Sequence, residues 1–193
     1  MMVDDALWRK AVAFHGHECP GLAIGFAAAL GAIAELGLEA AALPATDEEI
    51  VCVTENDACG VDAIQVVLGC TYGKANLIPR LRGKMAFSFF TRPRHAPGEP
   101  PAAASRAVRL MLRPEAGAGL SRAEFQRHLL EAPYEELFEL AVPGYGLPEA
   151  ARLFASHPCS VCGEKTAEPF LRVVESEYVC LDCYQGYQRE GFK

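Results

Sequence analysis

The sequence of 193 residues has no long apolar run and is short of basic residues. Its most apolar stretch, residues 22–34, is shorter than the ~20 residues that a helix needs to cross a bilayer. Lys and Arg number 18 against 25 Asp and Glu, which gives a formal charge of −7. This charge repels nucleic-acid phosphates and anionic lipids unless a local basic patch reverses it. We therefore expect no membrane span, and nucleic acid is disfavoured as a partner.

The acidic N-terminus lacks the apolar run of a signal peptide, which predicts a cytoplasmic protein. The sequence also has neither a GxSxG motif nor a phosphate-binding loop, so no catalytic class is indicated. It does have eight cysteines. In a reducing compartment these are expected to bind metal rather than to form disulfides.

Four of the cysteines form two close pairs near the C-terminus, Cys159-x-x-Cys162 and Cys180-x-x-Cys183. Zinc takes four tetrahedral ligands, and two such pairs supply them. A hairpin is expected at residues 170–179 and a short helix after the last cysteine, the layout of a treble-clef finger. A four-thiolate site has no position for a substrate, and so small a domain needs the metal to fold, so this zinc is predicted to be structural. Two redox pairs or disulfides are the minor alternative.

A second group of metal-ligating residues lies in the first half of the chain, in the segment His15-Gly-His17-Glu-Cys19 and at Cys59. Both cysteines are expected at helix N-termini, where the helix dipole stabilises a thiolate. If the two loops meet, His17, Cys19 and Cys59 supply one nitrogen and two sulfur ligands and leave a fourth zinc position open. On spacing alone, buried cysteines and helix-capping histidines remain the alternative.

A polar loop at residues 69–76 contains Cys70, Lys74 and Asn76, and Asp62 precedes it on an expected helix, for which Asn56 or Asp57 is the expected cap. Lys74 and Asn76 can present hydrogen-bond donors to an anionic or carbonyl group of a ligand. The alternative is a solvated loop with an ordinary surface lysine.

The apolar spacing predicts secondary structure along the whole chain. Helices are expected at residues 4–14, 21–36, 60–68, 102–112, 121–130 and 134–142, strands at 49–55 and 84–91, and a last turn at 148–154. Strands and helices do not alternate strictly, which favours a segregated layout. The expected fold is α+β, with a core of helices packed on a mainly antiparallel or mixed sheet in residues 1–155. The small C-terminal treble-clef zinc finger follows in residues 156–193.

Three motifs occur in a defined order: FHGHECPGLAIG at residues 14–25, ENDACGVDAIQVVLGCTYGKANL at 55–77 and GKMAFSF at 83–89. Together they resemble the family of the E subunit of formylmethanofuran dehydrogenase, and the C-terminal cysteine pairs resemble the finger that some members carry. The resemblance covers most of residues 8–92 and the tail. It implies an α+β core and a homodimer. It implies His17, Cys19 and Cys59 as ligands of a core metal, and Asp62, Cys70, Lys74 and Asn76 as residues of a ligand pocket. His15 is a further candidate for binding the ligand.

The resemblance favours a metal-binding accessory or subunit-type protein, in which a zinc with an open position adjoins a small-ligand pocket and a redox enzyme is the partner. One alternative is a stand-alone zinc enzyme that acts on a small carbonyl or carboxylate substrate, with Glu18, Glu55, Asp57 or His15 as general base. Another is an adaptor that binds protein through its finger. Nothing in the chain resembles a pterin-binding subunit, so the family name alone does not predict the activity.

Overall fold

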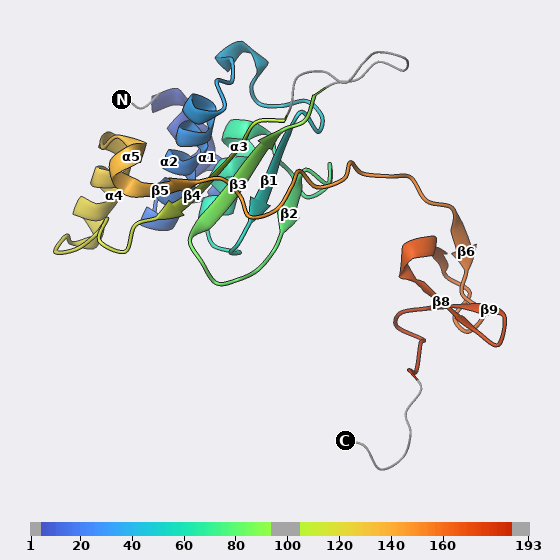
Figure 1. Cartoon of the computed structure of the whole chain (residues 1–193). Coiled ribbons are helices and arrows are strands. Elements are labelled where there is room, and N and C mark those ends of the chain that lie inside the picture. Colours follow the sequence, from blue (N-terminus) through green and yellow to red (C-terminus); the bar gives the residue numbers. More distant parts are fainter. Residues whose placement is uncertain (1–4, 94–104, 187–193) are drawn as a thin grey trace. The chain divides into compact units, whose positions relative to one another are not determined.

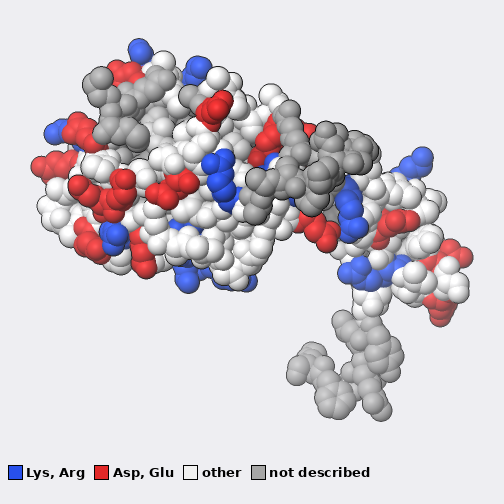
Figure 2. Space-filling model, turned by 45° about the horizontal axis from the view of Figure 1, so that its top comes forward, with Lys and Arg blue, Asp and Glu red and all other residues white. Residues whose placement is uncertain are grey.

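A computed structural model describes residues 5–93 and 105–186 (Figure 1). The chain divides into two compact units, Met1–Ala151 and Arg152–Lys193, and each is described by itself. In the part of the chain that the structure describes, no helix combines the length and the apolar character that crossing a membrane requires. Figure 2 shows a face on which the described Lys and Arg side chains are interspersed with Asp and Glu.

The first unit is built on a five-stranded sheet with the order β2-β1-β3-β4-β5. The strands are β1 (Ile50–Thr54), β2 (Leu77–Pro79), β3 (Ala86–Thr91), β4 (Ala107–Leu112) and β5 (Phe138–Ala141). Strand β2 is parallel to β1, and every other neighbouring pair is antiparallel. The α+β class with a mixed, mainly antiparallel sheet is thus confirmed.

Helices pack on one face of this sheet (Figure 1). They are α1 (Asp5–His15), α2 (Pro20–Glu35), α3 (Gly60–Leu68), α4 (Arg122–Glu131) and the short α5 (Tyr134–Leu137), with a 3-10 turn at Ala40–Ala42. Ten of the 16 residues of α2 are buried, because α1, α3 and α4 surround it. A side chain at Gly25 of α2 would overlap the backbone of Gly60 in α3, so glycine lets these two helices approach closely.

Strand β1, helix α3 and strand β2 form a parallel β-α-β unit. The carboxyl ends of β1 and β2 therefore lie at the same edge of the sheet as the N-terminus of α3. In α/β units this edge is where ligands commonly bind, because loops and a helix N-terminus converge there. The candidate site lies here.

The opposite face of the sheet is covered by residues 142–151, here called the strap, which crosses the strands in Figure 1. The hydroxyl of Tyr145 donates to Ser88 Oγ at 2.9 Å, and the Tyr145 and Phe90 ring centroids lie 6.0 Å apart. The guanidinium of Arg80 lies over the Tyr145 ring, 4.8 Å from its centroid. All five residues of β1 are buried because helices cover one face of the sheet and the strap covers the other.

The second unit contains two small hairpins. The strands are β6 (Ser156–Pro158) with β7 (Lys165–Ala167), and β8 (Leu171–Val174) with β9 (Glu177–Cys180), with a 3-10 turn at Glu168–Phe170. The first cysteine pair lies between β6 and β7, and the second begins at the end of β9. The expected hairpin is confirmed. Most of the short helix expected after Cys183 lies outside the described residues.

Three expectations for secondary structure were wrong. Of the helix expected at residues 102–112, the first three residues lie outside the described part, and the rest contains strand β4. Of the helix expected at 134–142, only α5 is helical, and β5 follows directly. The turn expected at 148–154 has no regular structure. For the two helices the reason is long-range pairing: β4 lies between β3 and β5, and this packing outweighs local helical spacing.

A candidate metal centre and its adjoining cavity

Three potential ligands come together at the start of α2. His15 is the last residue of α1, and the chain turns at Gly16, whose φ of +94° favours glycine. Cys19 is the N-cap of α2, and its Sγ accepts a hydrogen bond from the backbone N of Leu22 at 3.3 Å. This is the helix N-terminal position that the sequence predicted for the thiol.

The ligand atoms of His15, His17 and Cys19 all lie within 4.8 Å of one another. The two imidazole centroids are 4.6 Å apart, and Nε2 of His15 lies 3.8 Å from Sγ of Cys19. Two imidazoles and a thiol form a donor set that suits zinc. The structure thus groups two of the three ligands expected from the sequence and adds His15 to them.

Cys59, the third expected ligand, is the N-cap of α3, a position expected for Asn56 or Asp57. A Cβ on Gly21 would lie 3.5 Å from Sγ of Cys59 and 3.8 Å from Sγ of Cys19, so both thiols adjoin Gly21. Burial, together with the neighbouring thiol of Cys19, raises the pKa of Cys59. Cys59 therefore lies beside the cluster but outside the group whose atoms are all mutually within 4.8 Å.

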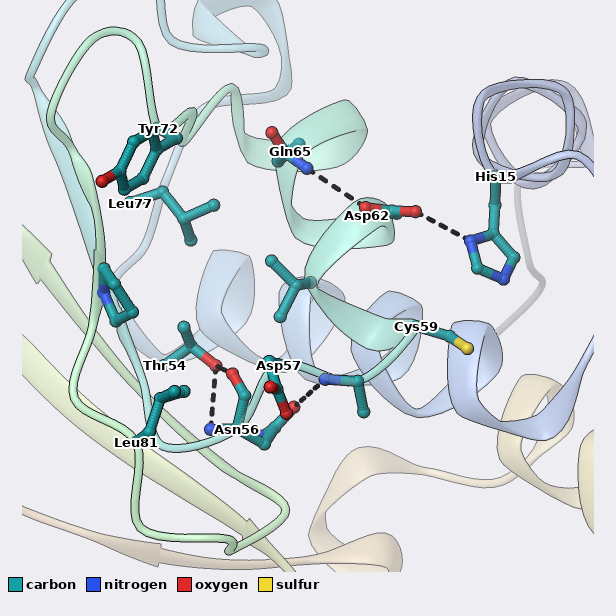
Figure 3. Close-up of a pocket in the computed structure, with 13 residues that line it drawn as sticks. His15, Thr54, Asn56, Asp57, Cys59, Asp62, Gln65, Tyr72, Leu77 and Leu81 are labelled. Atoms are coloured by element: carbon teal, nitrogen blue, oxygen red, sulfur yellow. Dashed lines mark hydrogen bonds and ion pairs between the residues drawn. The ribbon is translucent and has the colours of Figure 1, made fainter.

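A carboxylate binds Nδ1 of His15, the ring nitrogen that is not the one near Cys19. Oδ2 of Asp62 lies 2.7 Å from Nδ1 of His15, and Nε2 of Gln65 donates to Oδ1 of Asp62 at 3.2 Å (Figure 3). A carboxylate on one ring nitrogen fixes the tautomer and directs the other nitrogen to a metal. Sequence spacing does not predict this pairing, because His15 and Asp62 are 47 positions apart in the sequence.

A cavity of about 480 Å³ adjoins the cluster (Figure 3). Its lining includes the polar residues His15, Thr54, Asn56, Asp57, Cys59, Asp62 and Gln65 and the less polar Ala58, Val61, Tyr72, Leu77, Pro79 and Leu81. In Figure 3, Tyr72, Leu77 and Leu81 form one side, and His15 and Cys59 lie at the other. In the same view, Sγ of Cys59 points away from Tyr72, Leu77 and Leu81.

Three residues expected in a ligand pocket instead bind the backbone around their own loop. The buried thiol of Cys70 donates to the carbonyl of Ile50 at 3.5 Å, and burial raises its pKa to about 12. Nζ of Lys74 donates to the carbonyl of Ala45 at 2.7 Å. Asn76, which is fully buried, donates from Nδ2 to the Ile50 carbonyl at 2.9 Å. Among the lining residues that the structure describes, none of the three is included.

The carboxylates considered as general bases lie in three different settings. Glu55 is buried and forms a two-point ion pair with Arg109, at 2.6 Å to Nε and 3.0 Å to Nη2, which lowers the pKa of Glu55. Glu18 accepts a hydrogen bond from Nε2 of Gln126 at 3.0 Å. Asp57 is exposed and lines the cavity.

In the second unit, the sulfur atoms of Cys159, Cys162, Cys180 and Cys183 lie within 4.8 Å of one another. Sγ of Cys162 and Sγ of Cys180 are 3.9 Å apart. Backbone hydrogen bonds from Cys180 and Cys162 lower the pKa of Cys159 to about 6, which favours the thiolate that a metal requires. The cluster can hold a metal and is consistent with a small zinc finger.

The structure therefore describes a metal-binding protein in which an α+β core precedes a four-cysteine finger. Residues 14–139 match the family model described as FmdE, molybdenum formylmethanofuran dehydrogenase operon. The match covers more than half of the chain, and the protein belongs to the FmdE family.

Two known proteins are similar to parts or all of this chain. A crystal structure of a tungsten formylmethanofuran dehydrogenase FmdE-like protein from Syntrophus aciditrophicus aligns with a TM-score of 0.56 and 22% identity, over 91% of this chain and 88% of that one. At this identity the likeness concerns the fold. A probable S-adenosyl-L-methionine-binding protein from Archaeoglobus fulgidus is 37% identical over 83 residues, which are 43% of this chain and 23% of the relative. The chain thus spans about a quarter of that relative's length.

Proposed function

We propose that the core of this metal-binding, subunit-type protein holds a zinc ion with one open position facing the cavity. The observation that carries the proposal is the convergence of His15, His17 and Cys19 within 4.8 Å, at a cavity that His15 and Cys59 line. Three of these four side chains are the ligands, and the sequence favours His17, Cys19 and Cys59. A four-coordinate zinc with three protein ligands keeps its fourth position for a small molecule.

The surrounding residues support such a site through their own contacts. Asp62 binds Nδ1 of His15, and Gln65 donates a hydrogen bond to Asp62. Two residues of helix α3, rather than a loop, therefore fix the orientation of the imidazole ring. When bound here, zinc would polarise a carbonyl or lower the pKa of a bound water. The chain's own contribution is to orient the imidazole and to offer a cavity that can take a small ligand.

Asp57 favours a second candidate, a stand-alone zinc enzyme. Of the three carboxylates considered as general base, Glu55 is held by Arg109 and Glu18 by Gln126, while Asp57 is exposed on the cavity wall. A carboxylate in this place can accept a proton from a molecule in the cavity. Turnover of a small carbonyl compound that disappears in Asp57→Asn, with zinc content unchanged, would favour this candidate.

We also propose a cytoplasmic homodimer that works with a redox-enzyme subunit. The family is described by an operon for a formylmethanofuran dehydrogenase, which supports a partner subunit. All eight cysteines are free, which supports a reducing compartment. Light scattering on the purified chain tests the dimer, because a monomer mass at micromolar concentration would contradict it.

The zinc content of the full chain tests the core site. The protein purified without added metal is expected to contain two zinc ions per chain. Cys19→Ser should remove the core ion and Cys162→Ser the finger ion, while Cys52→Ala, a buried cysteine outside both clusters, should keep both. One zinc per chain in the unmodified protein, still present in Cys19→Ser, would rule out the core site.

A further inference from the structure

The charged residues of the cavity differ from those that the sequence suggested. Lys74 and Asn76 were expected to present donors to an anion or a carbonyl group. In the structure, Lys74 Nζ is bound to Ala45 O at 2.7 Å, and Asn76 is buried and bound to backbone oxygen atoms. The amide of Asn76 and one N–H of Lys74 are therefore engaged outside the cavity lining.

The basic residues that follow β2 also face other partners. Arg80 stacks over Tyr145 of the strap on the opposite face of the sheet, 4.8 Å from the ring centroid. Nη1 of Arg82 donates to the carbonyl of Leu81 at 2.8 Å. Among the described residues that line the cavity, the only Asp, Glu, Lys or Arg are Asp57 and Asp62. The charged lining is thus entirely acidic.

The cavity also contains an aromatic ring and an apolar wall. The ring of Tyr72 is 76% exposed and lines the cavity mouth with Leu77 and Leu81, opposite α3 (Figure 3). The aromatic ring and the two leucines favour an apolar body, and the carboxylate of Asp57 attracts a cationic group. A zinc ion held by two thiolates brings no net charge that would reverse this preference.

We propose that the cavity binds a small organic cation, an ammonium group carried on an apolar body, and rejects carboxylates and phosphates. The cationic group lies near Asp57, and the apolar body packs on Tyr72, Leu77 and Leu81. This inference rests on the proposed function, because it names the class of ligand for the same cavity. It predicts against the carboxylate substrate that is among the alternatives from the sequence.

Three probes of similar size and different charge test the inference on the zinc-loaded full chain. They are 2-phenylethylamine, which is cationic at pH 7, 2-phenylethanol, which is neutral, and phenylacetate, which is anionic. Dissociation constants are measured by ligand-observed NMR titration. We expect the amine to bind at least about tenfold more tightly than phenylacetate, with the alcohol between them, because the only full charges on the wall are negative.

Variants identify the residues responsible. Asp57→Asn keeps the shape and removes the charge, and it should reduce the preference for the amine about three- to fivefold, as expected for a solvent-accessible charge pair. Tyr72→Phe should keep amine binding, and Tyr72→Leu should weaken it. Glu136→Gln on α5, outside the cavity lining, is the matched control and should change nothing.

The outcomes separate this inference from the proposed function. Phenylacetate binding as tightly as the amine, a preference unchanged in Asp57→Asn, or no binding of any probe would overturn the inference. Zinc is counted on the same samples. One zinc per chain together with an amine preference that depends on Asp57 would uphold the cation site and reject the core zinc. Two zinc ions per chain with no amine preference would uphold the core zinc and reject the cation site.

Discussion

Oδ2 of Asp62 lies 2.7 Å from Nδ1 of His15, and Nε2 of the same ring lies 3.8 Å from Sγ of Cys19. One imidazole therefore joins a carboxylate on α3 to the thiol that caps α2. The contact thus links α3, the helix that follows β1, to the loop that carries His17 and Cys19.

Asp62→Asn tests whether His15 takes the place of Cys59 among the three core ligands. Losing a carboxylate that orients a metal-bound histidine usually weakens zinc binding about 10- to 100-fold, so a loss of this size would identify His15 as a ligand. Competition with a chromophoric chelator measures the affinity. The finger zinc serves as an internal reference, since its four cysteines lie in the other unit. Core affinity equal to that of the unmodified protein would show that Asp62 does not orient a ligand.

Loss of the ion pair between Glu55 and Arg109 should destabilise the core in a pH-dependent way. Glu55→Gln leaves the half-buried guanidinium of Arg109 without its charge partner, which costs about 2 kcal/mol in the free energy of unfolding at pH 7. Arg109 lowers the folded-state pKa of Glu55 below its ordinary 4.5, so the stabilisation is present above that value and is lost as the pH falls through the lower folded-state pKa. Urea unfolding at pH 7 and at about pH 3 should therefore show the difference between the two proteins shrinking in acid.

Glu139→Gln is the control for the ion pair. Glu139 lies on β5, in the strand beside Arg109, but it is exposed. Removal of an exposed carboxylate should change the stability by less than about 1 kcal/mol. An equal loss in both variants would indicate that general charge on this face matters, rather than the pair itself.

Cys52 and Cys70 should resist alkylation in the native protein. Burial raises the pKa of both thiols, that of Cys70 to about 12, so neither forms the reactive thiolate at pH 8. Mass spectrometry after iodoacetamide treatment should find both unmodified until the protein is unfolded. The clustered cysteines should become reactive when a chelator removes metal. Rapid labelling of Cys70 in the folded, metal-loaded protein would contradict the buried setting.

Gly25→Ala should destabilise the core by more than about 3 kcal/mol, because the new methyl group overlaps the backbone of Gly60 and helices α2 and α3 must separate. Gly31→Ala in the same helix is the matched comparison. There the methyl group meets the Leu110 side chain at 2.7 Å, which can move more easily than backbone can. Thermal unfolding should therefore show a clearly smaller loss for Gly31→Ala.

The sequence predicted those parts of the fold that depend on local spacing. Helices α1, α2 and α3 and strands β1 and β3 lie close to their expected positions, because their apolar periods agree with their packing. Strands β4 and β5 were misread as helices, since partners far along the chain determine their pairing. Strand β2 was missed because its three residues carry too little pattern.

For the candidate site, sequence spacing could indicate only neighbours along the chain. His17 and Cys19 were readable as a pair, and Cys59 entered through its expected helix N-terminus. The partnership of His15 with Asp62 depends on how α1 packs on α3, which no spacing encodes. Lys74 and Asn76 show another limit of sequence spacing, because side chains of a type that can bind a ligand also donate hydrogen bonds to backbone oxygens around their own loop.

The loop at residues 69–76 affects the thermodynamics of ligand binding in the cavity. Lys74 and Asn76 are already hydrogen-bonded to backbone oxygens before any ligand arrives, so the backbone that carries Tyr72 is held in place during folding. A molecule that enters the cavity has less chain to order, and the entropy loss on association falls mainly on the molecule itself and on a few side chains. Loosening the loop by Asn76→Ala would therefore make ligand binding entropically less favourable even though Asn76 does not line the cavity.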